Sequence, residues 1–341
     1  MKKIVFIGGI GHKNEFGGEL TKNKMIVSYL KDEGYRLKLV DTHNAKQRPW
    51  NILLLPLYFL LYPKAELIIS TSLDNVISLL KILKVLKTNR NVVYWGIGGS
   101  FPKRIKEGLI DKELLSVFSI IIVEGHSMKD TLLECGFKNV IVCPNFKKIF
   151  YIPTPIKPQI PKFVFLSRIQ PEKGVQFILD VAKKLNKDGL ENKYVIDFYG
   201  GISSDFSAQF DDELKPFSNV NYKGTLNLNS KEGYDLLSSY SAMLFPTIWA
   251  GEGFPGVIID AYISGLPVIA TDWSLNKEFI IDGKTGFIVP LDDVENNMYL
   301  VMLSIINKQV NIEAMSDECQ AQVKKYDVSN AIKHSGIQSY L

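Results

Sequence analysis

Two acidic residues, Glu252 and Asp260, are separated by seven residues in a stretch that begins as a glycine-rich turn. The apolar residues after Gly256 predict a helix that carries Asp260 about one and a half turns from its start. Backbone N–H groups at such a helix start point toward an anion or toward sugar hydroxyls. An acid in the turn and a second acid in the helix therefore suit a ligand that contains both sugar and phosphate.

Two cations, Arg168 and Lys173, follow a predicted strand at 162–167 and precede a predicted helix. Arginine offers a planar fork to phosphate oxygens, lysine adds a mobile point charge, and a helix start attracts anions. Both cations suit the binding of phosphate oxygens, and we expect them to lie in an open cleft. Exposed loop cations without a ligand would give the same short pattern.

The stretch 251–271 resembles the acid-x7-acid signature of the retaining glycosyltransferases of family four, which have the GT-B fold. The matching residues are Glu252-Gly253-Phe254, Asp260-Ala261 and Gly265-Leu266-Pro267-Val268-Ile269-Ala270-Thr271. This chain departs from the family at Asp260, where glutamate is usual and the side chain is one methylene longer. The competing interpretation is a glycine-capped core helix with two incidental acids.

The resemblance implies roles for individual residues. Arg168 and Lys173 would hold the donor diphosphate, Glu252 the hydroxyls of the transferred sugar, and Asp260 the ribose diol. The expected donor site comprises Gly17, Gly18, Arg168, Lys173, Glu252, Gly253, Phe254, Gly256, Val257 and Asp260, and its expected catalytic residues are Glu252, Arg168 and Lys173.

A first glycine-rich loop, residues 8–19, follows the predicted strand 3–8. Glycines let backbone amides approach a phosphate closely, and resembling enzymes place a Gly-Gly pair here, which Gly17 and Gly18 match. A dinucleotide fingerprint lacks its third glycine, because Asn14 stands there. A Walker A motif ending at Lys284 also fails, since Glu278 occupies the position of its first glycine.

A second glycine-rich loop, residues 95–102, follows the predicted strand 91–95. It could bind an acceptor, or it could be a tight turn followed by solvated lysines. Many relatives carry a histidine near this loop, but this chain has none there. The candidate acceptor residues are His12, Gly98, Gly99, Ser100, Lys103 and Arg104.

Apolar, β-rich runs alternate with segments of helical period along the whole chain, which predicts parallel sheets covered by helices on both faces. The predicted strands are 3–8, 36–41, 66–71, 91–95, 119–124, 139–143, 162–167, 194–199, 219–223, 242–246, 267–271 and 285–289. The predicted helices include 19–33, 74–88, 126–135, 173–187 and 230–239.

We therefore expect an α/β protein with two Rossmann-like, doubly wound domains that face a central cleft. Residues 1–152 would bind the acceptor, 153–161 would be a linker, 162–322 would bind the nucleotide sugar, and 323–341 would cross back to the first domain. Ligands of open α/β sheets bind beyond the carboxyl ends of the strands, which is where the motifs lie.

The net charge of +4 conceals an asymmetry between the halves. Residues 1–150 carry 23 basic and 13 acidic residues, whereas residues 151–341 carry 17 and 23. The three cysteines form no Cys-x-x-Cys and no Cys/His cluster, which favours a reduced cytoplasm without a structural metal. The apolar run at the N-terminus is too short for a signal peptide. No Asp-x-Asp occurs, so we expect neither a metal nor a cofactor.

The apolar and aromatic run 50–62 is too short to span a bilayer, but it could lie in a membrane interface. The run 78–90 adds lysines beside leucines and isoleucines. Peripheral contact with an anionic membrane, at the inner face of the plasma membrane, is one interpretation, and a buried helix of the first domain is the other.

The resemblance thus implies a retaining, metal-independent hexosyltransferase of cell-surface polysaccharide synthesis. Its donor would be a UDP-sugar, with a GDP-sugar as the alternative, and its acceptor a glycan or a polyprenyl-diphosphate-linked sugar. We expect no nucleic-acid partner. The rival hypotheses are a catalytically inactive nucleotide-sugar-binding protein and a sugar epimerase or phosphorylase of the same fold.

Overall fold

The computed structural model describes residues 3–12, 15, 17–43, 50, 55–85 and 90–341. The chain forms two compact units. The first contains residues 1–148 and 325–341, and the second contains residues 149–324.

The first unit is built on a six-stranded parallel sheet in the order β2-β1-β3-β4-β5-β6. Its strands are β1 (Lys3–Gly8), β2 (Arg36–Asp41), β3 (Glu66–Thr71), β4 (Val92–Gly96), β5 (Ile120–Val123) and β6 (Val140–Val142). Its helices are α1 (Gly18–Asp32), α3 (Leu55–Leu61), α4 (Ile77–Val85), α5 (Phe101–Lys106), α6 (His126–Glu134) and α14 (Val328–Ser335), with short 3-10 turns η1 (Leu73–Asn75), η2 (Lys112–Val117) and η5 (Ile337–Tyr340).

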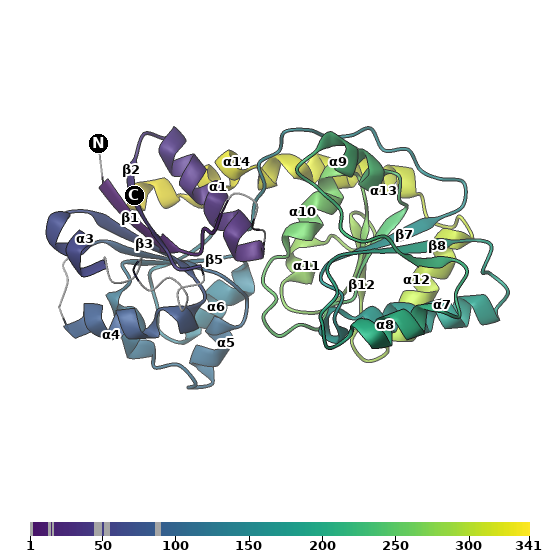
Figure 1. The fold of residues 1–341 in the computed structure, drawn as a ribbon, viewed down its shortest axis with the longest axis horizontal. Helices are drawn as coiled ribbons and strands as arrows, with labels where there is room; N and C mark the ends of the chain where they lie inside the picture. The colour runs from purple at the N-terminus through teal and green to yellow at the C-terminus, as the bar shows by residue number, and fades with distance from the viewer. Residues whose placement is uncertain (1–2, 13–14, 16, 44–49, 51–54, 86–89) are drawn as a thin grey trace. The chain divides into compact units, whose positions relative to one another are not determined.

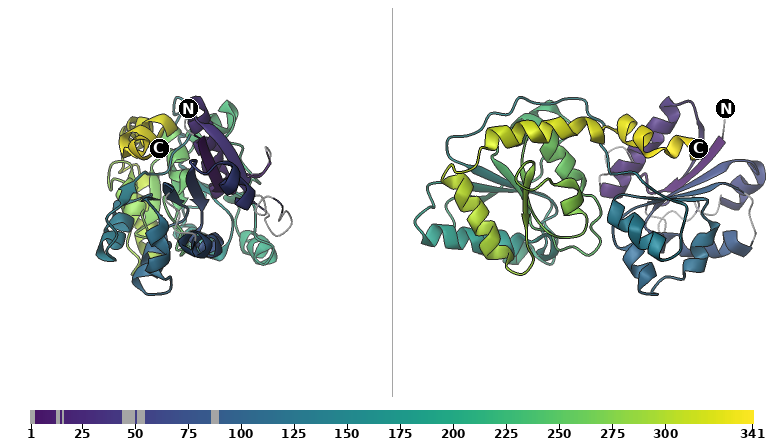
Figure 2. Two further views of the ribbon diagram at one scale, coloured as in Figure 1. Left: turned by 90° about the vertical axis from the view of Figure 1, so that its left-hand side faces the viewer. Right: turned by 180° about the vertical axis from the view of Figure 1, so that it is seen from behind.

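Helices α1 and α14 cover one face of this sheet, and α4 and α5 lie on the opposite face (Figures 1 and 2). Ile4 and Phe6 of β1 pack with Leu30 of α1 and Ile332 of α14 in one buried cluster. The C-terminal segment is also held through its backbone, because the Lys147 N–H donates to Tyr326 O and Lys147 O accepts from the Val328 N–H. The last residues of the chain are therefore part of the core of the first unit.

The second unit has a six-stranded parallel sheet in the order β12-β11-β10-β7-β8-β9. Its strands are β7 (Lys162–Leu166), β8 (Val195–Tyr199), β9 (Val220–Tyr222), β10 (Ala242–Phe245), β11 (Val268–Thr271) and β12 (Gly286–Val289). Its helices are α7 (Val175–Lys187), α8 (Ser207–Leu214), α9 (Lys231–Ser238), α10 (Gly256–Ile263), α11 (Asn276–Phe279), α12 (Val294–Ile306) and α13 (Ile312–Gln322), with the 3-10 turn η3 (Pro171–Lys173). The 3-10 turn η4 (Val323–Tyr326) begins in the second unit and ends in the first.

Helices α7, α8 and α12 lie on one face of the second sheet, and α9, α10 and α13 lie on the other (Figure 1). Phe163 and Phe165 of β7 pack with Ile178 of α7 and Met298 of α12 in the largest buried cluster described for this unit. The strands are nearly continuous apolar runs because both of their faces are covered.

All twelve predicted strands are confirmed, with small differences at their ends. Two predicted helices begin later than expected. The helix predicted at 74–88 starts with η1 and becomes α4 at Ile77, and residues 86–88 lie outside the described part. The helix predicted at 173–187 starts at Val175, because Gly174 before it has a left-handed backbone with φ of 76°.

Candidate functional site

The order of strands in the second unit changes direction between β7 and β10, which lie side by side. Such a point opens a crevice beyond the carboxyl ends of the two strands, and ligands of α/β sheets bind there. The loop 167–174 leaves β7 at this edge, and the loop 246–255 leaves β10. The two loops carry the predicted cations and the first predicted acid.

Lys173 and Glu252 form a buried ion pair in which Lys173 Nζ lies 2.5 Å from Glu252 Oε2. The two side chains are only 8% and 11% exposed. The Thr247 hydroxyl donates to the same carboxylate oxygen at 3.0 Å. The expectation of an open position is therefore wrong for Lys173, since the lysine is covered by the loop after β10, including the Trp249 ring at 5.9 Å from Nζ.

Arg168 differs from Lys173 in its surroundings. Its side chain is exposed, and within the described part of the chain it forms no ion pair. An exposed guanidinium keeps all of its N–H donors available for an anionic ligand. The predicted pair of cations thus consists of one buried lysine with a carboxylate partner and one available arginine.

Gly174 sets how closely the two loops approach one another. Its φ is 76°, and a Cβ at this position would stand 2.0 Å from Pro246 O. Any side chain here would therefore push the loop after β7 away from the loop after β10. The glycine next to Lys173 thereby allows the lysine to reach Glu252.

The backbone around Glu252 is held by three hydrogen bonds. The Glu252 N–H donates to Trp249 O at 3.0 Å, Ser274 Oγ donates to Glu252 O at 2.6 Å, and Trp273 Nε1 donates to Trp249 O at 2.8 Å. The carboxylate is consequently presented by a fixed turn.

Helix α10 begins at Gly256, directly after this turn, and Pro255 at its N-cap offers no side-chain hydrogen bond. Gly256 and Val257 are half-buried, and the first N–H groups of a helix have no partner within it. Gly253 and Phe254 are buried, and Phe254 stacks on Phe279 with ring centroids 3.6 Å apart. Phe254 therefore packs the turn against α11.

Asp260, the second acid, is 4% exposed and accepts a hydrogen bond of 2.8 Å from Tyr234 Oη. Burial and the neighbouring Asp260 carboxylate raise the pKa of Tyr234, so its hydroxyl remains a donor. The sequence analysis did not identify Tyr234 or Thr247. Thr247 follows a predicted strand end, which is a usable signal, whereas nothing in the sequence distinguishes Tyr234.

The first unit has a corresponding switch point between β1 and β3. A pocket of about 390 Å³ lies there, lined by Gly9, Gly17, Gly18, Glu19, Leu20, Thr42, His43 and Asn75. Gly17 and Gly18 thus lie at a cavity, and four polar residues of its lining, Glu19, Thr42, His43 and Asn75, were not among the residues expected from the sequence. Residues 13, 14 and 16 of the same predicted loop lie outside the described residues.

Among these neighbours, Glu19 has a carboxyl group whose pKa is shifted by its surroundings. Its Oε1 accepts a hydrogen bond from the Gly9 N–H at 3.2 Å. Burial raises its pKa above the ordinary value, and hydrogen bonds from Thr71 and Gly9 reduce that effect. A partly desolvated carboxyl in a cavity is a candidate for binding hydroxyl groups.

The remaining candidates lie elsewhere in the first unit. The exposed His12 donates its N–H to Glu15 and accepts from Lys24 through its carbonyl. Arg104 makes a bidentate pair with Asp74 at 2.7 and 2.9 Å, and Lys103 has a 79% exposed side chain. Gly98, Gly99 and Ser100 form the turn before α5, where Gly98 has a φ of 87°.

Two kinds of feature do not occur among the described residues. They contain no group of three or more His, Cys, Asp or Glu that could hold a metal ion. Nor do they include a helix with the length and apolar character needed to cross a bilayer.

Part of the second unit is similar to known proteins. Residues 160–307 match the family described as Glycosyl transferases group 1. The chain is similar to the UDP-Gal:alpha-D-GlcNAc-diphosphoundecaprenol alpha-1,3-galactosyltransferase of Escherichia coli, with 24% identity over 169 residues, which cover 47% of this chain. The chain spans only 40% of the length of that relative.

Two solved structures share the fold. The apo form of the lipopolysaccharide outer core galactosyltransferase WaaB has a TM-score of 0.70 and 15% identity, covering 99% of this chain and 100% of its own. The complex of Anabaena HepE with UDP-glucose has a TM-score of 0.70 and 14% identity, covering 100% of both chains. These likenesses show the predicted GT-B fold of two Rossmann-like units.

Proposed function

We propose that this chain, whose residues 160–307 match the family described as Glycosyl transferases group 1, transfers a hexose from a nucleotide-diphosphate sugar with retention of anomeric configuration. The observation that carries the proposal is the pairing of Lys173 with Glu252, supported by Thr247, at the strand switch point of the second unit. A cation and a hydroxyl-binding acid fixed side by side suit the junction of a diphosphate and a sugar.

We assign each part of the donor to protein groups whose chemistry suits it. Arg168 and Lys173 neutralise the diphosphate, and the N–H groups of Gly256 and Val257 at the start of α10 donate hydrogen bonds to its oxygens. Glu252 binds hydroxyls of the transferred sugar, and Asp260, oriented by Tyr234, binds the ribose diol. Gly253 and Phe254 shape the turn, and Gly17 and Gly18 approach the donor phosphates.

The chemistry follows from this distribution of charge. As the glycosidic bond breaks, the sugar becomes oxocarbenium-like and negative charge develops on the leaving diphosphate. Arg168, Lys173 and the helix-start amides stabilise that charge. The acceptor attacks on the face from which the diphosphate departs, and a donor phosphate oxygen takes the acceptor proton. In this scheme cationic side chains do the work that a divalent ion does in metal-dependent enzymes.

We further propose a UDP-sugar as donor and a glycan or polyprenyl-diphosphate-linked acceptor in cell-surface polysaccharide synthesis. The support is that the similar E. coli protein is named for UDP-Gal and a diphosphoundecaprenol acceptor, and that HepE binds UDP-glucose. Residues of the first unit, including Glu19 and His43 at its pocket, would bind the acceptor. The other acceptor candidates do not line this pocket; they are His12, Gly98, Gly99, Ser100, Lys103 and Arg104.

The first unit is also proposed to contact an anionic membrane from the cytoplasmic side. Leu57, Leu61 and Ile82 are 46%, 59% and 55% exposed, within or beside the basic runs noted in the sequence. Exposed apolar side chains among cations are typical of interfacial attachment.

One assay separates this function from its rivals. The protein is incubated with UDP-sugars, with and without a polyprenyl-diphosphate-linked sugar, while released UDP and the anomeric configuration of the product are followed. A transferase releases UDP and forms an α-linked product when acceptor is present, and a chelator leaves the rate unchanged. An epimerase converts the donor without acceptor, and an inactive binding protein shifts its melting temperature with UDP-sugar but turns nothing over.

A further inference from the structure

A second cavity lies in the first unit at the amino-terminal edge of the sheet, opposite the edge that carries the switch-point pocket. It has a volume of about 220 Å³ and is lined by Lys3, Ile4, Val5, Arg36, Leu37, Lys38, Tyr62 and Ala65. The parallel register places Lys3 beside Arg36 and Val5 beside Lys38, so the three cations project from the same face of β1 and β2.

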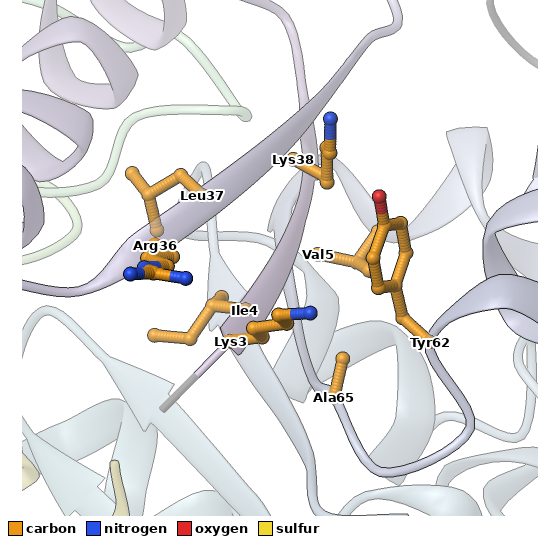
Figure 3. Close-up of a pocket in the computed structure, with 8 residues that line it drawn as sticks. All are labelled: Lys3, Ile4, Val5, Arg36, Leu37, Lys38, Tyr62 and Ala65. Carbon is orange, nitrogen blue, oxygen red and sulfur yellow. The ribbon is translucent and has the colours of Figure 1, made fainter. Parts of the chain in front are cut away.

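The cations surround an aromatic ring. Lys3 Nζ lies 5.0 Å and Lys38 Nζ 5.8 Å from the centroid of the Tyr62 ring. Figure 3 shows Tyr62 on one side of the hollow and Arg36 across from it, with Lys3 and Lys38 beside the tyrosine. Within the described part of the chain, none of the three cations pairs with an acidic side chain. Three like charges at one cavity attract an anion.

Arg90 fixes the segment that carries Tyr62. Its guanidinium donates to Phe59 O and Tyr62 O at the end of α3, and it lies 5.0 Å from the centroid of the Phe59 ring. Tyr62 is therefore held against the cations by a contact that does not depend on a ligand.

An apolar ridge, formed by Leu57 and Leu61, directly precedes the pocket residue Tyr62 in the chain. Leu57 and Leu61 are four residues apart on α3, so they lie on one face of the helix, and both are exposed. Trp50, which precedes α3 in the chain, is 73% exposed. A soluble anion such as a nucleotide would not contact such a ridge. A phospholipid, in contrast, presents a phosphate beside an acyl surface that could contact both the cations and the ridge.

We propose that the pocket formed by Lys3, Arg36, Lys38 and Tyr62 binds the phosphate of an anionic phospholipid headgroup, with Leu57 and Leu61 resting in the interface. This inference rests on the proposed membrane contact and deepens it, because it replaces a diffuse charge attraction by a defined phosphate site. The site is separate from the donor-binding residues of the second unit.

The test compares two triple variants that lose the same charge. The first is Lys3→Gln, Arg36→Gln, Lys38→Gln. The matched control is Lys31→Gln, Lys112→Gln, Lys138→Gln, whose lysines are exposed in the same unit and do not line the pocket. Binding is measured by co-sedimentation with vesicles of phosphatidylcholine alone, phosphatidylcholine with phosphatidylglycerol, and phosphatidylcholine with oleate at matched surface charge. UDP binding, followed by thermal shift, checks that each variant is folded.

Each basic residue near an anionic surface strengthens binding about fivefold. The pocket variant is therefore expected to bind phosphatidylglycerol vesicles roughly 100-fold more weakly than the unchanged protein, and at least about tenfold more weakly than the control variant. The unchanged protein should prefer phosphatidylglycerol to oleate vesicles, and Tyr62→Phe should reduce that preference.

Four outcomes would overturn the inference. Equal losses in the two triple variants, or equal binding to phosphatidylglycerol and oleate, would mean diffuse attraction and leave the membrane contact standing. Displacement from vesicles by low concentrations of free glycerol phosphate would make a soluble phosphate the ligand. The unchanged protein could also bind UDP but none of the vesicles. That result would contradict the membrane contact itself, and it would leave the glycosyl-transfer proposal unaffected.

Discussion

Lys173 and Glu252 are 79 positions apart in the chain, yet their charged atoms lie 2.5 Å from one another and both side chains are nearly buried. The pair joins the loop after β7 to the loop after β10. It therefore links the stability of the second unit to the groups proposed to bind donor, and the two effects must be measured separately.

Removing one member of this pair should destabilise the second unit. Lys173→Met or Glu252→Gln is expected to lower the free energy of unfolding by about 3 kcal/mol, since a buried charge loses its partner. The double variant should lose clearly less than the sum of the two. Urea unfolding followed by tryptophan fluorescence reports this, because Trp249 and Trp273 lie beside the pair. The exposed pair Lys277–Asp272 is the control, and Lys277→Met should cost no more than about 1 kcal/mol.

Arg168→Ala should affect ligand binding without affecting folding. The exposed side chain has no ion-pair partner in the described part of the second unit, so urea unfolding should be unchanged. Affinity for UDP should fall by about 1.5–3 kcal/mol, the value of a hydrogen bond to a charged group. Lys187→Ala, an exposed charge at the far end of α7, serves as the control. Calorimetry showing the same UDP affinity in both variants would remove Arg168 from the donor site.

Glu252 and Asp260 should fail in different ways. Glu252→Gln is expected to reduce turnover far more than affinity for UDP, because its assigned ligand is the sugar. Asp260→Asn should weaken the binding of UDP and should also remove the preference for UDP over 2′-deoxy-UDP, because its assigned ligand is the ribose diol.

The matched control for Asp260 is Tyr234→Phe, which removes the hydrogen bond to Asp260 while keeping the carboxylate. This variant should lower the affinity for UDP only moderately, and it should still bind UDP more tightly than 2′-deoxy-UDP. An Asp260→Asn variant that still discriminates between the two nucleotides would restrict Asp260 to a packing role.

Lys157 should make the stability of the second unit depend on pH. Its Nζ donates to Gly265 O at 2.8 Å and Tyr240 O at 3.1 Å, and burial lowers its pKa from 10.5 to about 8. Between these values the unfolded chain binds more protons than the folded one, so stability rises as the pH increases from 8 to 10.5. Relative to Lys157→Met, the unchanged protein should gain at most about 3 kcal/mol over this range. A constant difference between the two proteins across the range would mean that the buried amine does not titrate there.

The sequence alone determined the alternation of strands and helices and the position of the motifs after strands. Apolar runs of four to six residues, bounded by glycine, proline and polar residues, can be buried on both faces only in a parallel sheet covered by helices. The loop after 162–167 and the turn at 251–256 could be located as site segments for the same reason, because a loop after a strand opens at the carboxyl edge of the sheet.

Only the tertiary structure decided which of these segments meet. The order of strands puts β7 next to β10, and that adjacency turns a lysine and a glutamate into an ion pair and buries Lys173. The tertiary structure likewise decides the hydrogen bond from Tyr234 to Asp260 and the buried Lys22–Glu124 ion pair of the first unit. Local periodicity records which side of an element is apolar, but it carries no information on which elements become neighbours. Contacts between charged groups distant in the chain are set by strand order and by close approaches such as Gly174 against Pro246.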